Sequence, residues 1–187
     1  MQEEFHTLGS AIDEVRSPLF TDDLSQLLAS AAPRTTLLYR GSRDGFTAQS
    51  FHLRCDGRPH TICVIKDDQN NVFGGYTDVP WTSSGGSWKH SDVSFLFRLS
   101  SEGQRNVTKF TLRGTDNKDA VYHNSSYLCV FGGRHDIVIS DNCNSNQISS
   151  CNIGKTYHNN GTPHILTGGR QRFQVAEIEV YQLDMSG

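Results

Sequence analysis

The sequence contains no long hydrophobic run and no leader-like start. No stretch approaches the roughly 20 consecutive apolar residues that a membrane-spanning helix requires. The first six residues, MQEEFH, are acidic where a secretory signal peptide would be basic and then apolar. We therefore expect a cytoplasmic protein that does not insert directly into a membrane.

Basic clusters and metal-binding spacings are also missing. The chain of 187 residues has 17 Lys and Arg against 20 Asp and Glu, a formal net charge of −3, and no basic block. Nucleic acid is therefore not an expected partner, because its recognition needs a concentrated positive surface. The five cysteines form no CxxC pair, and the histidines form no HxH or HxxxH pair. No Lys-Ser/Thr follows the glycine pairs, as a phosphate loop would require. We expect neither a metal nor a cofactor.

Two short segments have helical character, and both precede the β-rich part of the chain. Apolar residues recur on one helical stripe between residues 17 and 33, with Thr21 as the expected N-cap. The stripe consists of Phe20, Leu24, Leu27, Leu28 and Ala31. A second helix is expected from Thr47, with Gly57 as its left-handed stop. Residues 1–16 are polar and aperiodic, so we expect a flexible lead-in there.

The rest of the chain has the pattern of short β-strands. Runs rich in β-branched and aromatic residues are separated by Gly, Asn, Asp and Ser, which are turn-forming residues. The expected strands are 35–40, 60–66, 72–79, 94–99, 107–113, 120–123, 127–131, 136–140 and 172–183. This spacing predicts a mostly β (α+β) protein, a two-sheet antiparallel β-sandwich flanked by a few helices. The expected organisation is a lead-in at 1–16, a helix at 17–33 that packs on the domain, and the sandwich at 34–187.

A series of motifs gives the sandwich a family resemblance. Together they resemble, in order along the chain, the signatures of the TLDc domain family (TBC, LysM and domain catalytic). The motifs are LLYRGSRDGF (37–46), TICVIKD (61–67), VFGGY (72–76), PW (80–81), SFLFRL (94–99), FGG (131–133), DIVISD (136–141), SSCNIG (149–154) and AEIEVY (176–181). Because Tyr181 stands where the family's closing strand usually has Trp, the chain resembles a divergent member.

This resemblance implies a β-sandwich flanked by helices and a non-enzymatic protein-interaction domain. It implies a role in oxidative-stress protection or in regulating the vacuolar proton ATPase, so the expected partners are proteins, including subunits of that ATPase. The opening motif is also similar to the TLDc-like region of interferon-induced antiviral proteins, in which a GTPase-like part follows. A third alternative is a small redox or hydrolytic enzyme that uses Cys151 or Glu179.

Charged residues supply the first candidate partner-binding positions. Arg43 and Asp44 lie in a loop that could bind a partner, but a tight turn in which Asp44 accepts hydrogen bonds from backbone amides is favoured. Glu177 and Glu179 flank one residue on the last strand, so alternation places both on the same face. Paired carboxylates could act as general acid and base, but a solvated sheet face gives the same pattern and is favoured.

Two tryptophans and one cysteine complete the candidates. Trp81 and Trp88 flank a Ser/Gly-rich segment, where exposed rings would suit a partner-binding hot spot. Packing onto the edge of the sandwich is the equal alternative. Cys151 lies among polar residues and would be a redox-sensitive nucleophile if a nearby cation lowered its pKa. A buried structural cysteine that anchors a loop is favoured.

Overall fold

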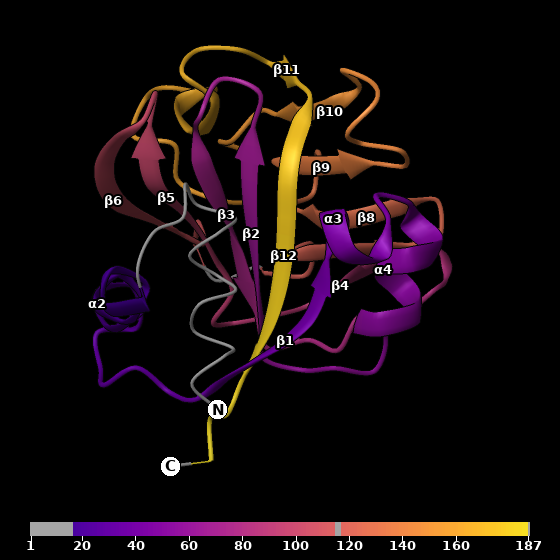
Figure 1. Ribbon diagram of the computed structural model, residues 1–187, viewed down its shortest axis with the longest axis horizontal. Coiled ribbons are helices and arrows are strands. Elements are labelled where there is room, and N and C mark those ends of the chain that lie inside the picture. The colour runs from indigo at the N-terminus through magenta and orange to yellow at the C-terminus, as the bar shows by residue number, and fades with distance from the viewer. Residues whose placement is uncertain (1–16, 115–116, 187) are drawn as a thin grey trace.

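The computed structural model describes residues 17–114 and 117–186, which form two antiparallel six-stranded sheets (Figure 1). The first sheet has the order β1-β12-β2-β3-β5-β6, and the second has the order β11-β10-β9-β8-β7-β4. The first sheet comprises β1 (Thr35–Arg40), β2 (Thr61–Asp67), β3 (Val72–Thr77), β5 (Phe95–Ser101), β6 (Gln104–Thr111) and β12 (Val175–Leu183). The second comprises β4 (Gly85–Lys89), β7 (Val121–Asn124), β8 (Tyr127–Phe131), β9 (Ile137–Ser140), β10 (Ser149–Cys151) and β11 (Arg172–Phe173). The predicted β-sandwich is confirmed.

Helices flank the sheets at both sides of the molecule, with α2 beside β6 and the pair α3 and α4 near β1 and β8 (Figure 1). They are α2 (Ser17–Leu28), α3 (Gly41–Asp44), α4 (Ala48–Cys55) and the 3-10 turn η1 (Ile165–Thr167). The predicted cap of α4 is confirmed, because the Thr47 hydroxyl accepts a hydrogen bond from the Ser50 amide at 3.1 Å. Gly57 has a φ of 79°, as the left-handed stop requires. The predicted start of the first helix at Thr21 is wrong, because α2 begins at Ser17. A proline is tolerated in its first turn, because proline has no backbone N–H and the N–H groups of a first turn have no acceptor within the helix.

The apolar core lies between the sheets, and a second apolar layer covers the outer face of the first sheet. The buried aromatic residues of the inner layer are Tyr39, Phe51, Phe73, Trp81, Phe110, Phe131, Tyr157 and Phe173. On the outer face, Leu24 and Leu27 of α2 pack in one cluster with Ile62 and Val64 of β2. Strand β2 is therefore buried on both faces, which explains its continuous apolar run.

The structure differs from the sequence prediction at three strands. The segments that form β4 and β10 were expected to be loops, since Gly, Ser and Asn dominate there. The predicted single strand 172–183 is interrupted at Gln174, and its two parts belong to different sheets. At this position the Asp68 carboxylate accepts a hydrogen bond from the Gln174 amide at 3.3 Å, and the Asp68 amide donates to the Gln174 carbonyl at 3.0 Å.

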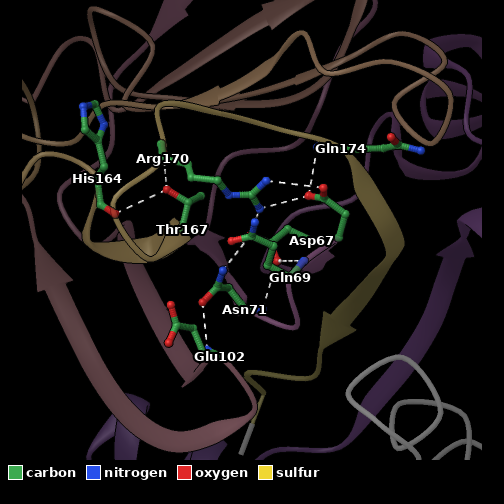
Figure 2. A network of polar contacts seen from close by, with 9 residues as sticks. Asp67, Gln69, Asn71, Glu102, His164, Thr167, Arg170 and Gln174 are labelled. Carbon is green, nitrogen blue, oxygen red and sulfur yellow. Dashed lines mark hydrogen bonds and ion pairs between the residues drawn. The ribbon is translucent and has the colours of Figure 1, made fainter.

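A buried polar network around Asp67 joins three turns at one end of the sandwich (Figure 2). The Asp67 carboxylate is buried and accepts hydrogen bonds at 2.9 Å from the amides of Gln69 and Asn71 and from the Asn71 side chain. Its second oxygen lies 3.1 Å from the Arg170 guanidinium. The Asn71 side chain in turn accepts from the Glu102 amide at 2.9 Å. The network thus connects the β2–β3 turn, the β5–β6 turn and the segment before β11.

Candidate functional site

The charged candidates come together where α3 meets β12. The Asp44 side chain is only 4% exposed and lies 2.9 Å from the Arg43 guanidinium and 3.3 Å from that of Arg54. It also accepts a hydrogen bond from the Arg40 amide at 3.0 Å, and Gly45 has a φ of 99°. Burial alone would raise the pKa of Asp44, but the bonds from the Arg43 guanidinium and the Arg40 amide outweigh it and hold that pKa below its usual range. Asp44 therefore acts as the cap of a tight turn, and Arg43 is the exposed member of its ion pair.

Glu179 is fully buried, so the expectation that it shares a solvated face with Glu177 is wrong. Its register partner on β1 is Arg40, whose guanidinium lies 2.7 Å from the first carboxylate oxygen. The Tyr181 hydroxyl donates to the second oxygen at 2.6 Å. Burial raises the pKa of Glu179 to about 7, and the bonds from Tyr181 and Arg40 oppose that rise. The first oxygen thus ties β12 to β1, and the second accepts a hydrogen bond from within β12.

Glu177 lies beside this tie but has a different role. It is half-buried, and its carboxylate accepts a hydrogen bond from the Ser42 amide at 3.1 Å and another from the Ile178 amide at 3.0 Å. It therefore fastens the first residues of α3 to β12. The arrangement holds α3 in place rather than presenting two carboxylates to a common substrate.

Replacing Glu179 with glutamine is expected to remove a pH-dependent loss of stability. Folding raises the pKa of the Glu179 carboxyl from 4.5 to about 7. Between these two pH values, the carboxyl is therefore protonated in the folded state and ionised in the unfolded state. The wild-type protein therefore loses stability as the pH rises through this window, and the loss is complete above about pH 7. The uncharged glutamine side chain keeps a carbonyl oxygen that accepts from the Arg40 guanidinium. Its amide group can donate a hydrogen bond to the Tyr181 hydroxyl oxygen. Relative to wild type, the variant should gain on the order of 3 kcal/mol between about pH 4.5 and about pH 8. Urea unfolding of both proteins measures this; a stability difference that does not change with pH would contradict it.

Trp81 and Trp88, which the sequence treats alike, have opposite environments. Trp81 is fully buried, its indole N–H donates to the Thr61 hydroxyl at 2.9 Å, and its ring centroid lies 5.5 Å from that of Phe51. Of the two equal alternatives for Trp81, packing onto the sandwich is therefore confirmed and an exposed ring is not, because the ring packs against Phe51 of α4 and Phe131 of β8. Trp88 stays at the surface with 38% of its area exposed.

Trp88 belongs to a group of four rings on the second sheet and its β8–β9 turn, which we call the aromatic surface: Trp88, Tyr122, Tyr127 and His135. The ring centroids of Trp88 and Tyr122 are 4.4 Å apart, and His135 lies 5.6 Å from Trp88 and 5.4 Å from Tyr122. Tyr127 lies 6.4 Å from His135. Burial lowers the pKa of His135, so the neutral imidazole is favoured.

Sequence reasoning did not find Tyr122, Tyr127 or His135. Tyr122 alternates with the buried His123 on β7, and this alternation is a signal that it faces outward. Its proximity to Trp88 follows only from β4, where the two residues are register partners. Gly86 leaves room for the Tyr122 ring, since a side chain at position 86 would collide with the Tyr122 hydroxyl.

Cys151 is buried on β10, and its environment favours the thiol. Burial raises the pKa of Cys151 to about 12, so the thiolate that a redox nucleophile needs is not populated near neutral pH. The nearby His164 ring lies 2.8 Å from the Cys151 carbonyl oxygen rather than at the sulfur. The other four cysteines are also free and buried. Cys151 thus has the environment of a structural residue.

The fold also brings together a serine, an aspartate and a histidine that the sequence did not single out. The Ser83 hydroxyl donates to Asp56 at 2.5 Å, and His52 Nδ1 lies 2.7 Å from the same carboxylate. His52 Nε2 faces the carbonyl oxygens of Asn124 and Tyr127 at 3.0 and 2.8 Å. Because the carboxylate stands between the other two groups, no histidine nitrogen is available to accept the serine proton. The trio ties α4 to the β7–β8 turn.

The described part of the chain contains no helix that is long and apolar enough to cross a membrane. Within residues 17–114 and 117–186, no group of three or more His, Cys, Asp or Glu side chains is placed to hold a metal ion.

Comparison with known protein families gives one match over nearly the whole chain. The sequence model described as the TLDc domain matches residues 15–184. The matched region contains both sheets, α3, α4 and the four rings of the aromatic surface.

Proposed function

Since the chain belongs to the TLDc domain family, we propose that it is a non-enzymatic protein-interaction domain that binds its partner through the aromatic surface. The observation that carries this proposal is the group of four neighbouring rings at the surface of the second sheet, with Trp88 38% exposed. Tyr and Trp are enriched at protein interfaces, because they bury a large area at low cost in side-chain entropy and keep a polar group for hydrogen bonding.

The environments of the ionisable candidates support a non-enzymatic role. Both oxygens of Glu179 accept hydrogen bonds within the fold, and the Cys151 thiol is buried with a raised pKa. Both nitrogens of His52 face acceptors. Glu179 and His52 are therefore used to join elements of the sandwich, and the Cys151 thiol is enclosed within it.

The finer role that we propose rests on the family. We infer that the protein acts in the cytoplasm, in protection from oxidative damage or in regulation of the vacuolar proton ATPase, and that subunits of this ATPase are among its partners. The contribution of the aromatic surface to this role is a site at which such a subunit would dock.

The test is recovery of partner proteins from cell extract by the tagged full chain at physiological salt. Trp88→Ala is expected to lower the recovery of specific partners at least tenfold, because truncating a central aromatic residue costs about 2 kcal/mol or more. Ile148→Ala is the matched control, since Ile148 is an apolar residue with 60% of its area exposed, next to β10 and away from β4 in the second sheet. Circular dichroism and thermal melts establish that both variants are folded. Equal recovery by Trp88→Ala and wild type would remove the basis of the proposal.

A further inference from the structure

His52 and Asp56 stand four residues apart at the end of α4, and this spacing places their side chains on one face of the helix. The His52 side chain is 5% exposed, whereas that of Asp56 is 29% exposed. Both residues line a surface pocket together with Ser83 and Ser125. The histidine is therefore enclosed, while its carboxylate partner stays in contact with water.

Both nitrogens of the His52 ring face acceptors. Nε2 faces the carbonyl oxygens of Asn124 and Tyr127 at 3.0 and 2.8 Å, so it needs a proton to donate. Nδ1 lies 2.7 Å from a carboxylate oxygen of Asp56, and the Ser83 hydroxyl donates to the other oxygen at 2.5 Å. A neutral imidazole has one N–H, which Nε2 uses, so a second proton must lie between Nδ1 and Asp56. Since imidazole is a stronger base than a carboxylate, this proton belongs to Nδ1 and the pair is an imidazolium with a carboxylate.

Loss of this proton to water turns a hydrogen bond of His52 into a contact between two acceptors. If Nε2 keeps its proton, the Nδ1 lone pair lies 2.7 Å from a carboxylate oxygen. If the remaining proton moves to Nδ1, Nε2 faces two carbonyl oxygens with nothing to donate. Unmatched polar groups are costly at a buried residue. Because the contact exists only in the folded chain, it stabilises the fold while the proton is present and is lost as the pH rises.

The two carbonyl groups belong to the turn that carries one ring of the aromatic surface. Helix α4 lies beside β8 (Figure 1). Asn124 is the last residue of β7 and the register partner of Gly85 on β4. Tyr127 is the first residue of β8, and its ring lies 6.4 Å from that of His135. His52 therefore fastens the β7–β8 turn to α4 and fixes the backbone from which Tyr127 reaches the aromatic surface.

Two other ionisable groups next to the pair stay neutral over the pH range in which histidine loses its proton. Burial lowers the pKa of His123 on β7 to about 4, and the charge of Lys89 on β4 adds to this shift. Burial raises the pKa of the Cys55 thiol on α4 well above its ordinary value. The nearby Arg54 guanidinium lies 3.3 Å from Asp44, with which it is paired. A change of charge near neutral pH at this end of α4 is therefore assigned to the pair itself.

We propose that the His52–Asp56 pair is a pH-sensitive clasp on the aromatic surface. While the pair holds the shared proton, it fixes the β7–β8 turn and the position of Tyr127. When rising pH removes the proton, the turn is released and partner binding weakens. The effect on binding rests on the proposed function, whereas the clasp itself rests on the contacts of His52.

The first test is NMR of the wild-type His52 ring, which requires no substitution. Long-range 1H–15N spectra are expected to show both ring nitrogens protonated at about pH 6, and one proton lost by about pH 9. A ring that carries a single proton at the lower pH, or two at both, would overturn the clasp.

Asp56→Asn is the matched variant, because asparagine can hold the same contact without the shared proton. Its amide donates to Nδ1 of a neutral His52, whose Nε2 proton stays on the two carbonyls, and its oxygen still accepts from Ser83. In urea unfolding, the folding equilibrium constant of wild type should fall about tenfold relative to this variant between about pH 7 and about pH 9. The contribution of Glu179 does not change over this range.

Asp92→Asn is the control for this substitution. It changes a second histidine–aspartate pair, in which His90 lies 3.1 Å from Asp92, but the two side chains are 55% and 74% exposed. This variant should keep the pH dependence of wild type, since exposed pairs contribute little. An Asp56→Asn protein with the same pH dependence as wild type and Asp92→Asn would contradict the clasp.

Recovery of partner proteins from cell extract tests the effect on binding. Between about pH 7 and about pH 9, recovery should fall at least about threefold for wild type and stay constant for Asp56→Asn, because affinity follows the fraction of chains with an ordered turn. If the ring titrates but both chains recover partners equally at both pH values, control of binding fails and the interaction domain stands. If Trp88→Ala recovers partners normally, the proposed function fails, and the NMR and unfolding results still decide the clasp.

Discussion

Replacing Gly74 with alanine is expected to prevent stable folding. Gly74 lies in β3 between β2 and β5, opposite Val64 and Phe97. A Cβ at this position would collide with the backbone carbonyl of Cys63 and would lie 2.9 Å from the Phe97 ring. A carbonyl in a central ladder cannot move aside without breaking hydrogen bonds, so we expect a loss of at least about 4–5 kcal/mol, a large part of the stability of a single domain.

Gly85→Ala is the matched control for this substitution. It also lies in a strand, but an added Cβ would meet nothing within 4 Å. We expect its stability to lie within about 0.5 kcal/mol of wild type. Soluble yield, circular dichroism and urea unfolding compare the three proteins. A Gly74→Ala protein with wild-type stability would show that β2 and β3 do not approach each other as described.

Replacing Asp67 with alanine is expected to cause the second largest loss. The substitution leaves the amides of Gln69 and Asn71 without their acceptor and Arg170 without its buried counter-ion (Figure 2). Removing one partner of a buried ion pair costs about 3–5 kcal/mol. The expected result is a much lower urea midpoint with an unchanged slope.

Asp68→Ala is the control for Asp67→Ala, because it removes a carboxylate that contacts the same guanidinium at 2.9 Å but has 33% of its side chain exposed. Its loss should be clearly smaller, since ion pairs near solvent contribute little. Equal losses in the two variants would mean that burial of Asp67 does not determine the strength of the network.

Much of the fold follows from local sequence patterns. Strands such as β1 and β8 have the predicted bounds, because β-branched and aromatic residues alternate there between turn-forming residues. Strands β4 and β10 could not be predicted, since Gly-Gly-Ser and Ser-Ser-Cys carry no strand pattern of their own. Their pairing depends on other strands: β4 pairs with β7, which is not the next strand along the chain, and β10 pairs with β9 and β11.

The candidate site was less predictable than the fold. Trp81 and Trp88 have similar local surroundings in the sequence, and only the tertiary structure gives one an internal partner in Thr61 and leaves the other beside Tyr122. Glu179 looked like a surface residue because its register partner, Arg40, lies on a strand that is distant in the sequence. The aromatic surface depends on β4, so it could not be found before that strand was known.

Recovery of partner proteins by the wild-type chain and by Trp88→Ala is the measurement that most directly tests whether the aromatic surface binds proteins. With both chains equally folded, wild type and Ile148→Ala should recover the same partners, and Trp88→Ala should recover at most about a tenth as much of each. Undiminished recovery by Trp88→Ala would contradict the assignment of this surface as the docking site.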